Sequence, residues 1–554
     1  MRRSFSTLVG APTLLLVAAL IYLPLCWQIP LTRCEAMYAL IPKEMLALGS
    51  WLTPYLNGAH YLDKPQLLYW LNLAAYKVFG VFDWVPRLVS MILTLMEVWL
   101  AYLIGRRLFS SRAAWLGGFV LLSSVGFFAL HIQILTDHLV TVALAASLYF
   151  LLRWQEEPRF RWAALFHLSL VAGFLSKGFI GVVFPLLIGA LYAWQQRQPQ
   201  FSRFFCCSRG LTLLLLLIIP WFVWVEQANP GFLKHQIINE QVMRFLGQRV
   251  PQDIAPYSLA EFWLFVAIWF LPWTLLLPEA LYRFWQETRP ETLPSRRRLL
   301  LIWAGVVLGF FTLSASRIEY YSLPALLPLA LVLGWRLDRF LTAPRDRILP
   351  WTLILLGLLG LVNLFLVPGI EHLCVTNRRE FCGMFALIQP LCLRFAVLAP
   401  LVALFGAVAG WRRPPVALAS LGALALIVLY FTFQTLAILS PNLSDQIPGK
   451  FVRTQAGPQD VVVMEQIEEF EYGASFAFYA DRRILMVQRG GLPQFPYPVP
   501  PEEDYLISPD RLKELWQGPR RVFLLIDDAV PREPFLEGAK VTLPLRGKCL
   551  LVNR

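Results

Sequence analysis

The chain has 554 residues, of which 57% are hydrophobic and 15% are charged, and its formal net charge is +13. Apolar runs recur along most of its length, which excludes a soluble enzyme and indicates an integral membrane protein. The positive charge does not indicate a nucleic-acid-binding protein, because the arginines fall in every second predicted loop. Anionic lipid headgroups are the expected partners of these arginines.

About thirteen segments are apolar enough to be membrane spans, if roughly 20 residues make one crossing. In chain order they are Leu8–Trp27, Val85–Ile104, Ala113–Leu130, His138–Leu152, Trp162–Leu175, Phe179–Trp194, Leu211–Val225, Leu259–Leu277, Leu299–Leu313, Ser322–Leu337, Leu349–Val367, Leu391–Ala409 and Pro415–Leu436. The first is interpreted as a retained span, since no clean small-residue cleavage site follows it. The arginine pattern predicts a cytoplasmic N-terminus, and an odd number of spans then predicts an external C-terminus.

Two external loops are predicted to be long, at about residues 28–84 and 226–258, and long ordered loops usually carry function. In the first, CEAMYALIPKEMLALGSW predicts a helix ending at Gly49, and the Asn57-Gly58 pair lies in a turn-rich stretch. A second helix is expected to open with Pro65 at its first position and to end at Gly80. Both helices should lie along the outer membrane interface.

Residues 442–554 mix charged and apolar segments and predict a small external α/β domain after a transmembrane domain of residues 1–441. Four segments read as strands and one as a capped helix: DVVVMEQ, RRILMVQ, RRVFLLIDD, KCLLVN and SPDRLKELWQG. Cys374 and Cys382 share one predicted external loop, where both a disulfide and two free thiols are compatible with the sequence.

Four groups of polar residues fall on the outer side of the predicted spans. They are Arg33, Glu35 and Tyr38; Tyr61, Asp63 and Lys64; Thr136, Asp137 and His138; and Arg244, Arg317, Tyr320 and Tyr321. Asp137 stands at the mouth of a span, where burying a carboxylate is costly without a purpose. Thr136 or Asp137 could also cap the helix, an alternative that is compatible with a site carboxylate. Glu35 is either a site carboxylate or a solvated surface charge.

The cations of these groups also have two interpretations. Lys64 lies beside a predicted helix N-terminus, which suits phosphate binding, or it extends toward the headgroups. Lys177 is expected to contact headgroups. Arg244 and Arg317 are arginines on the outer side, which indicates an anionic ligand or an anchor for a helix end.

The evidence for a metal is weaker, and the cofactor is left unknown. Asp63 with a distant carboxylate could bind a divalent cation, but no ligand spacing requires it. His138 and His235 are interpreted as structural histidines.

Carboxylates and cations at one membrane face indicate group transfer from a lipid-linked phosphate donor. A carboxylate would act as general base, and cations would stabilise the departing phosphate.

Several motifs together resemble one family. They are E-x-x-Y-A, KEML, G-x-W-L-T-P-x-L-N-G, Y-x-D-K-P-x-L-x-Y-W, LTD, SKG, N-E-x-x-x-R-F and S-x-S-R-x-x-Y-Y-x-L-P, in this order. The set resembles the bacterial phospholipid-carrier-dependent glycosyltransferases of the GT-C class, similar to the lipid A aminoarabinose transferases and, more remotely, the protein O-mannosyltransferases. The fold class implied is an all-α polytopic membrane protein with interfacial helices and a small periplasmic α/β domain.

The resemblance implies an undecaprenyl-phosphate sugar as donor and an inverting transfer at the periplasmic face of a bacterial inner membrane. It matches Asp137 to a catalytic-region aspartate, Lys64 to the lysine on the carrier phosphate and Arg244 to a cavity arginine. It further assigns Tyr38 and Tyr61 to the cavity, and Tyr320 or Tyr321 to the donor. Lipid A or another envelope lipid or glycan is the expected acceptor, and the chain is expected to be a monomer.

The chain departs from the family pattern at two places. Cys34-Glu35 stands where the family usually has Asp-Glu, so either Glu35 takes over or Asp137 acts alone. Asp63 and Asn239 stand where the aminoarabinose transferases have a glutamate and a histidine of a metal site, which weakens the expectation of zinc. The alternatives left open are an O-mannosyltransferase-like enzyme, a flippase for lipid-linked saccharides and a family member that binds the carrier without chemistry.

Overall fold

The computed structural model describes residues 10–198, 200–250, 256–289, 295–343, 346–374, 379–465, 473–487, 505–527, 530, 532–545 and 547–554. The chain forms two compact units. The first unit comprises Met1–Cys26, Ser90–Pro220 and Pro256–Ile438, and the second comprises Trp27–Val89, Trp221–Ala255 and Leu439–Arg554. The two long loops predicted from the sequence therefore belong to the same unit as the C-terminal residues.

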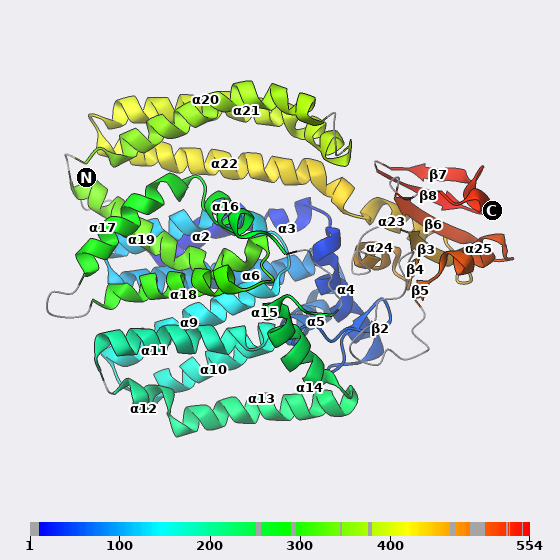
Figure 1. The fold of residues 1–554 in the computed structure, drawn as a ribbon, viewed down its shortest axis with the longest axis horizontal. Helices are drawn as coiled ribbons and strands as arrows, with labels where there is room; N and C mark the ends of the chain where they lie inside the picture. Colours follow the sequence, from blue (N-terminus) through cyan, green and yellow to red (C-terminus); the bar gives the residue numbers. More distant parts are fainter. Residues whose placement is uncertain are drawn as a thin grey trace. The chain divides into compact units, whose positions relative to one another are not determined.

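The first unit is helical (Figure 1). Its helices, some of which run on into the second unit, are α2 (Ala11–Tyr22), α3 (Leu25–Gln28), α6 (Val85–Leu108), α7 (Ser111–Leu122), α8 (Val125–His131), α9 (Thr136–Glu156), α10 (Phe160–Lys177), α11 (Ile180–Gln196), α12 (Phe201–Phe205), α13 (Ser208–Ala228), α16 (Leu259–Trp269), η2 (Trp273–Leu276), α17 (Leu277–Thr288), η3 (Arg296–Arg298), α18 (Leu299–Leu313), η4 (Glu319–Ser322), α19 (Leu323–Thr342), α20 (Ile348–Cys374), α21 (Arg379–Gly410) and α22 (Pro414–Leu443).

In the described part of the chain, each of the thirteen predicted spans coincides with one of these helices or with two or three consecutive ones. Among the described residues, six helical segments are long and apolar enough to cross a membrane, namely Ala11–Gln28, Val85–Leu108, Ser208–Ala228, Glu319–Thr342, Phe385–Gly410 and Pro414–Leu443. Two further pairs qualify as broken spans, α7 with α8, bent by 62°, and α16 with the η2–α17 segment, bent by 100°. The polytopic membrane class is confirmed, whereas the number thirteen stays a prediction.

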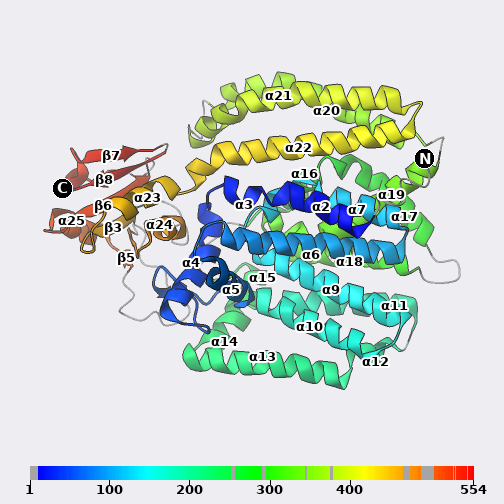
Figure 2. The ribbon, with the colours of Figure 1, turned by 180° about the vertical axis from the view of Figure 1, so that it is seen from behind.

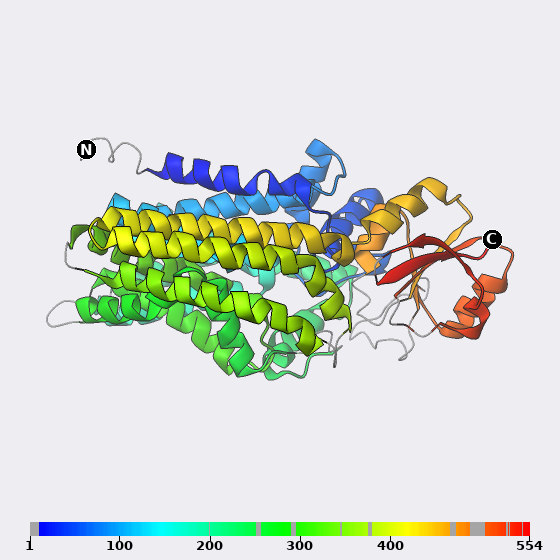
Figure 3. The same cartoon turned by 90° about the horizontal axis from the view of Figure 1, so that it is seen from above.

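Helices α9, α10 and α11 pack side by side (Figures 1 and 2). Helices α20, α21 and α22 also lie alongside one another (Figures 1 and 3). The backbones of α10 and α11 approach each other closely at two glycines. A Cβ added to Gly181 would lie 2.1 Å from the carbonyl carbon of Gly173. Small residues allow such backbone contact between helices in a membrane. This contact fixes the position of Lys177, the last residue of α10.

The loops of the second unit form α4 (Arg33–Leu48), β1 (Tyr55–Leu56), β2 (Ala59–His60), α5 (Leu67–Phe79), α14 (Phe232–Lys234), the π-helix η1 (His235–Met243) and α15 (Arg244–Leu246). Gly49 (φ 65°) and Gly80 (φ 82°) end α4 and α5 as predicted. Asn57 and Gly58 both have positive φ and make the two-residue turn of the β1–β2 hairpin. The predicted role of Pro65 is wrong, because Gln66 is the N-cap and α5 begins at Leu67.

The C-terminal part of the second unit is a six-stranded sheet with strand order β5-β4-β3-β6-β8-β7. Its elements are α23 (Gln446–Gln455), β3 (Val461–Glu465), α24 (Gly473–Ala480), β4 (Leu485–Val487), β5 (Leu506–Ile507), α25 (Pro509–Gln517), β6 (Val522–Asp527), η7 (Pro534–Leu536), β7 (Lys540–Pro544) and β8 (Lys548–Val552). The first four strands are parallel, and β8 and β7 are antiparallel. All four predicted strands and the helix capped by Ser508 are confirmed.

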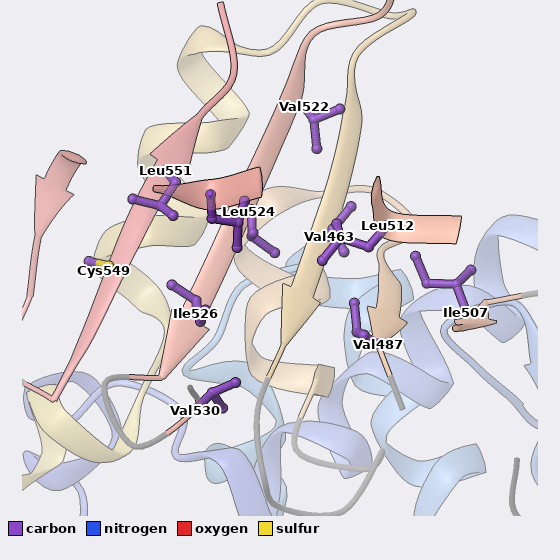
Figure 4. Packing of buried hydrophobic residues seen from close by; sticks show 11 residues of the cluster. Val463, Val487, Ile507, Leu512, Val522, Leu524, Ile526, Val530, Cys549 and Leu551 are labelled. Carbon is purple, nitrogen blue, oxygen red and sulfur yellow. The ribbon is translucent and has the colours of Figure 1, made fainter. Parts of the chain in front are cut away.

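Aliphatic side chains from β3, β6 and β8 form the core on one face of this sheet (Figure 4). The sheet part also contacts the first long loop, because Asn57 exchanges two hydrogen bonds with the Ile484 backbone and the Tyr479 hydroxyl donates to Asp83 at 3.0 Å. The boundary at residue 441 therefore stays a prediction. The side chains of Cys374 and Cys382 lie outside the described residues.

Candidate active site

Asp137 and Lys177 form a buried ion pair in the first unit. Asp137 is the second residue of α9, and Lys177 Nζ donates to its two carboxylate oxygens at 2.7 and 2.8 Å. Exposed fractions of 6% and 12% for the two side chains show that the pair is largely screened from solvent. The expected headgroup contact of Lys177 is therefore wrong. The capping alternative is also wrong, because Leu135 is the N-cap of α9 and no side chain caps it.

Two aromatic rings complete this group. Lys177 Nζ lies 4.5 Å from the ring centre of Tyr321 and 5.6 Å from that of Tyr320, within the range of cation–π attraction. Both tyrosines belong to η4. Lys177 therefore contacts Asp137 and the two tyrosines, and these four residues come from three separate parts of the sequence. Among the described residues, the Asp137 carboxylate accepts from Lys177, and its remaining lone pairs keep acceptor capacity for a proton from a substrate hydroxyl.

The Arg317 side chain, by contrast, donates hydrogen bonds to backbone carbonyl groups. Its guanidinium donates to the carbonyl of Ser314 at 2.6 and 3.0 Å and to the carbonyl of Tyr257 at 3.3 Å. These contacts agree with the anchoring alternative for this arginine, since they tie the segment before η4 to the start of α16. Its role in ligand binding stays a prediction.

A second polar group, here called the Asp63 network, lies in the second unit. It comprises Asp63, Lys64, His235, Glu240, Arg244 and Arg249. Arg249 bridges the two carboxylates, with one nitrogen 2.5 Å from Asp63 Oδ2 and another bonded to Glu240 Oε1. Glu240 Oε2 also accepts from Lys64 Nζ at 3.2 Å and from Arg244 at 2.8 Å.

The charges of this network shift the pKa values of both carboxyl groups. Burial and the neighbouring Glu240 raise the pKa of Asp63, but Arg249 and His235 outweigh them, so the pKa of Asp63 lies below its usual value. Burial likewise opposes ionisation of Glu240, and Lys64, Arg244 and Arg249 overcome it, which holds the pKa of Glu240 well below the usual range. Both carboxylates are therefore charged at neutral pH.

His235 is a partner of Asp63 and not an isolated structural histidine. Its Nε2 lies 2.8 Å from Asp63 Oδ1. Asn239, which stands where the family has a metal-binding histidine, instead clamps Val250: its side chain donates to the Val250 carbonyl at 2.7 Å and accepts from the Val250 amide at 2.9 Å. This clamp holds the residue next to Arg249 and so places the guanidinium between the two carboxylates.

The Asp63 network does not fit the divalent metal that the sequence allowed at Asp63. One ligand atom each of Asp63, His235 and Glu240 lie within 4.8 Å of one another, which is close enough for a shared ion. However, three cationic side chains already surround two carboxylates, and Arg249 takes the position between them. A divalent ion would have to displace a buried guanidinium, leaving it unpaired.

The remaining predicted residues also lie in the second unit. Glu35 forms a capping box with Thr32 at the start of α4 and an ion pair with Arg87, and its side chain is 1% exposed. Tyr38 stacks on Tyr69 with ring centres 6.2 Å apart. The Tyr61 hydroxyl contacts the sulfur of Met37 at 3.8 Å. The solvated alternative for Glu35 is therefore wrong, and the side chain of Cys34 lies outside the described residues.

Comparisons with known proteins agree with the motif resemblance. The family described as dolichyl-phosphate-mannose-protein mannosyltransferase matches residues 63–224. An undecaprenyl phosphate-alpha-4-amino-4-deoxy-L-arabinose arabinosyl transferase of Pseudomonas fluorescens is 32% identical over 367 residues, which are 64% of this chain and 64% of the relative. The corresponding transferase of Aeromonas salmonicida is 31% identical over 60% of each chain. The aligned part thus spans less than two thirds of these relatives.

The fold is shared over nearly the whole chain. The crystal structure of ArnT from Cupriavidus metallidurans bound to undecaprenyl phosphate superposes with a TM-score of 0.80 and 22% identity, covering 98% of this chain and 97% of that one. The apo form of the same protein gives a TM-score of 0.77. The fold is therefore that of a GT-C membrane protein. More narrowly, the chain is similar to the aminoarabinose transferases and to the protein O-mannosyltransferase family.

Proposed function

We propose that the chain is a multi-pass glycosyltransferase of the bacterial inner membrane that transfers a sugar from an undecaprenyl-phosphate donor to an envelope lipid or glycan at the periplasmic face. The observation that carries the proposal is the buried Asp137–Lys177 pair with its two tyrosines, on a fold shared with ArnT. The N-terminus is proposed to be cytoplasmic and the C-terminal residues periplasmic, because the arginines follow the positive-inside rule.

In the proposed reaction, Asp137 accepts the proton of the acceptor hydroxyl as its oxygen attacks the anomeric carbon. The bond from that carbon to the phosphate oxygen breaks with inversion, and undecaprenyl phosphate leaves with the bonding electrons. Lys177 orients Asp137 by donating to both of its carboxylate oxygens. Glu35 is already engaged by Thr32 and Arg87, so Asp137 is proposed to act as the base without it.

The donor phosphate is proposed to bind Lys64 and Arg244. The Asp63 network has one cationic side chain more than it has carboxylates, an excess that favours an anion. Lys64 and Arg244 are its more exposed cations, at 16% and 20%, whereas Arg249 is 5% exposed. Tyr38, Tyr61, Tyr320 and Tyr321 are proposed to contact donor or acceptor. Lipid A or another envelope lipid or glycan is the proposed acceptor, as the motif resemblance to the lipid A aminoarabinose transferases implies, while the names of the relatives give the carrier and the sugar.

The test uses the purified chain in lipid nanodiscs with undecaprenyl-phosphate aminoarabinose and lipid A, and mass spectrometry of the products. Asp137→Asn should lower the transfer rate by about 10²- to 10⁴-fold, as expected for loss of a general base. Asp338→Asn is the matched control, because Asp338 pairs with Arg112 at a more exposed position of the same unit and should leave the rate unchanged.

Unchanged transfer by Asp137→Asn would contradict the assignment of the base. Movement of the lipid-linked sugar across the bilayer of proteoliposomes that hold the purified chain, without any transfer product, would support the flippase alternative. A product found on protein acceptors and absent from lipid A would support the O-mannosyltransferase-like alternative.

A further inference from the structure

Glu97 is a buried acid in the middle of a candidate membrane span. Glu97 lies on α6 and is 1% exposed. The sequence analysis did not select it as a candidate site residue. Ionisable residues at such depth are costly and usually have a partner. Among the described residues, no lysine or arginine forms an ion pair with Glu97. Its side chain instead contacts His131, whose Nε2 lies 3.0 Å from Glu97 Oε1.

The protonation of His131 makes this contact unusual. Its other nitrogen, Nδ1, lies 2.7 Å from the carbonyl oxygen of Phe127, and a carbonyl oxygen can only accept, so Nδ1 carries the hydrogen. In the neutral ring, Nε2 then presents a lone pair to the Glu97 carboxylate. Two electron-rich atoms at 3.0 Å require a proton or a cation between them.

His138 repeats this pattern beside His131. The centres of the two rings are 4.1 Å apart. His138 Nε2 lies 3.1 Å from the carbonyl oxygen of Gln133 and so carries its hydrogen, whereas Nδ1 is buried and has no hydrogen-bond partner among the described residues. His138 is 0% exposed, so water does not reach this lone pair from the surface.

Both rings thus donate one N–H to a backbone carbonyl and leave the other nitrogen as a buried acceptor. This is the arrangement that surrounds histidines bound to metals, because the outer hydrogen bond fixes the tautomer and the ring orientation. One ligand atom from each of Glu97, His131 and His138 lie within 4.8 Å of one another. One carboxylate and two imidazoles are a ligand set that suits Zn²⁺.

We propose that Glu97, His131 and His138, here called the Glu97 cluster, bind one divalent transition-metal ion of the zinc type. The ion would neutralise the buried carboxylate and use both lone pairs. It would also join the middle of α6 to the end of α8 and the first turn of α9. Because His138 follows Asp137 directly, the ion would be a structural support for the Asp137–Lys177 pair, and it does not depend on the transfer reaction proposed above.

The test measures metal in the full-length chain, purified in detergent, loaded with Zn²⁺ and freed of excess ion by gel filtration. Elemental analysis should find about one zinc per chain, and removal of the zinc by a strong chelator should lower the thermal unfolding midpoint. Glu97→Gln and His131→Gln should each lower the zinc content to about a tenth or less. His167→Gln is the matched control, since His167 is also buried and both its ring nitrogens face backbone carbonyls.

Two further measurements keep the outcome clear. If a variant fails to fold, Co²⁺ loaded into the wild-type chain should give the visible absorption bands of a low-symmetry site with nitrogen and oxygen ligands. His235→Gln, in the Asp63 network, should leave the zinc content unchanged. Zinc that is lost in His235→Gln and kept in Glu97→Gln would overturn the proposal. So would a wild-type chain that binds no zinc and unfolds at the same temperature with and without chelator, which would mean that Glu97 carries a proton.

Discussion

The Asp63 network and the Glu97 cluster both place carboxylate and imidazole atoms within 4.8 Å, yet they differ in what balances the charge. The Asp63 network holds two carboxylates, one imidazole and three lysine or arginine side chains. The Glu97 cluster holds one carboxylate and two imidazoles, each of which presents a lone pair. Closeness of ligand atoms is therefore not sufficient evidence of a metal site. A group of this kind is a candidate metal site only when no lysine or arginine already neutralises its carboxylates.

The location of each group explains this difference. The residues of the Asp63 network come from loops outside the candidate spans, where long basic side chains can reach water and headgroups at low cost. Glu97 lies in the middle of a span, where a permanently charged lysine or arginine is expensive and neutral histidines are tolerated. A buried acid there needs either a proton or an ion taken up from solution.

The largest expected effect comes from removing the internal cation of the Asp63 network. Arg249→Gln leaves Asp63 and Glu240 without their bridge, and unpairing a buried ion pair typically costs about 3–5 kcal/mol. The thermal unfolding midpoint in nanodiscs should fall accordingly. Arg244→Gln is the control, because Arg244 is more exposed and contacts Glu240 at one atom, so the cost should be about 1 kcal/mol or less.

The same variant sharpens the comparison. Without the Arg249 guanidinium, no cation bridges the possible metal ligands Asp63, His235 and Glu240. Added Zn²⁺ should therefore recover part of the stability that Arg249→Gln loses. It should not stabilise Arg244→Gln, in which Arg249 is still present. Equal stability of the two variants would contradict the interpretation of Arg249 as the substitute for a metal.

An intermediate effect is expected when one carboxylate in each group is replaced by its amide. Asp63→Asn leaves the buried Arg249 with one partner fewer and should destabilise the chain by about 1–3 kcal/mol. Glu97→Gln, compared in metal-free protein, removes a buried acid whose partner among the described residues is His131 and not a lysine or arginine. It should therefore be neutral or stabilising. Unfolding midpoints measured in chelator test both, and a loss of stability of the same size in the two variants would show that the groups do not differ.

Much of the fold could be predicted from the sequence because its signals are local. Apolar runs predicted the helices, and Gly49 and Gly80 predicted two helix ends. Short apolar segments in the charged C-terminal region predicted β3, β4, β6 and β8. The start of α5 was misplaced, since Pro65 suits several positions near a helix N-terminus. The strands β5 and β7 were missed because β5 has two residues and β7 is an edge strand with exposed polar positions.

The site residues could be predicted individually, whereas their partners could not. Asp137 was recognisable at the mouth of a span, but its pairing with Lys177 depends on the close α10–α11 turn and joins residues 40 positions apart. His235 was expected to be isolated because its partner Asp63 is 172 positions away. Glu97 had a usable signal, since an acid inside an otherwise apolar span is unusual, and it was passed over in favour of residues at span ends.

The smallest effect concerns the pH dependence of the Asp63 network. The pKa of Asp63 in the folded chain lies below its ordinary value of 3.8, because Arg249 and His235 outweigh the effects of burial and of Glu240. The stabilisation from its charge is then complete above pH 3.8 and is lost as the pH falls through the lowered pKa. The difference in free energy of unfolding between wild type and Asp63→Asn should thus stay constant from pH 7 to pH 5 and narrow below about pH 4, at up to about 1.4 kcal/mol per pH unit. Chemical denaturation at each pH measures this difference. A difference that narrows already between pH 7 and pH 5 would mean that the carboxyl of Asp63 is not held ionised by its network.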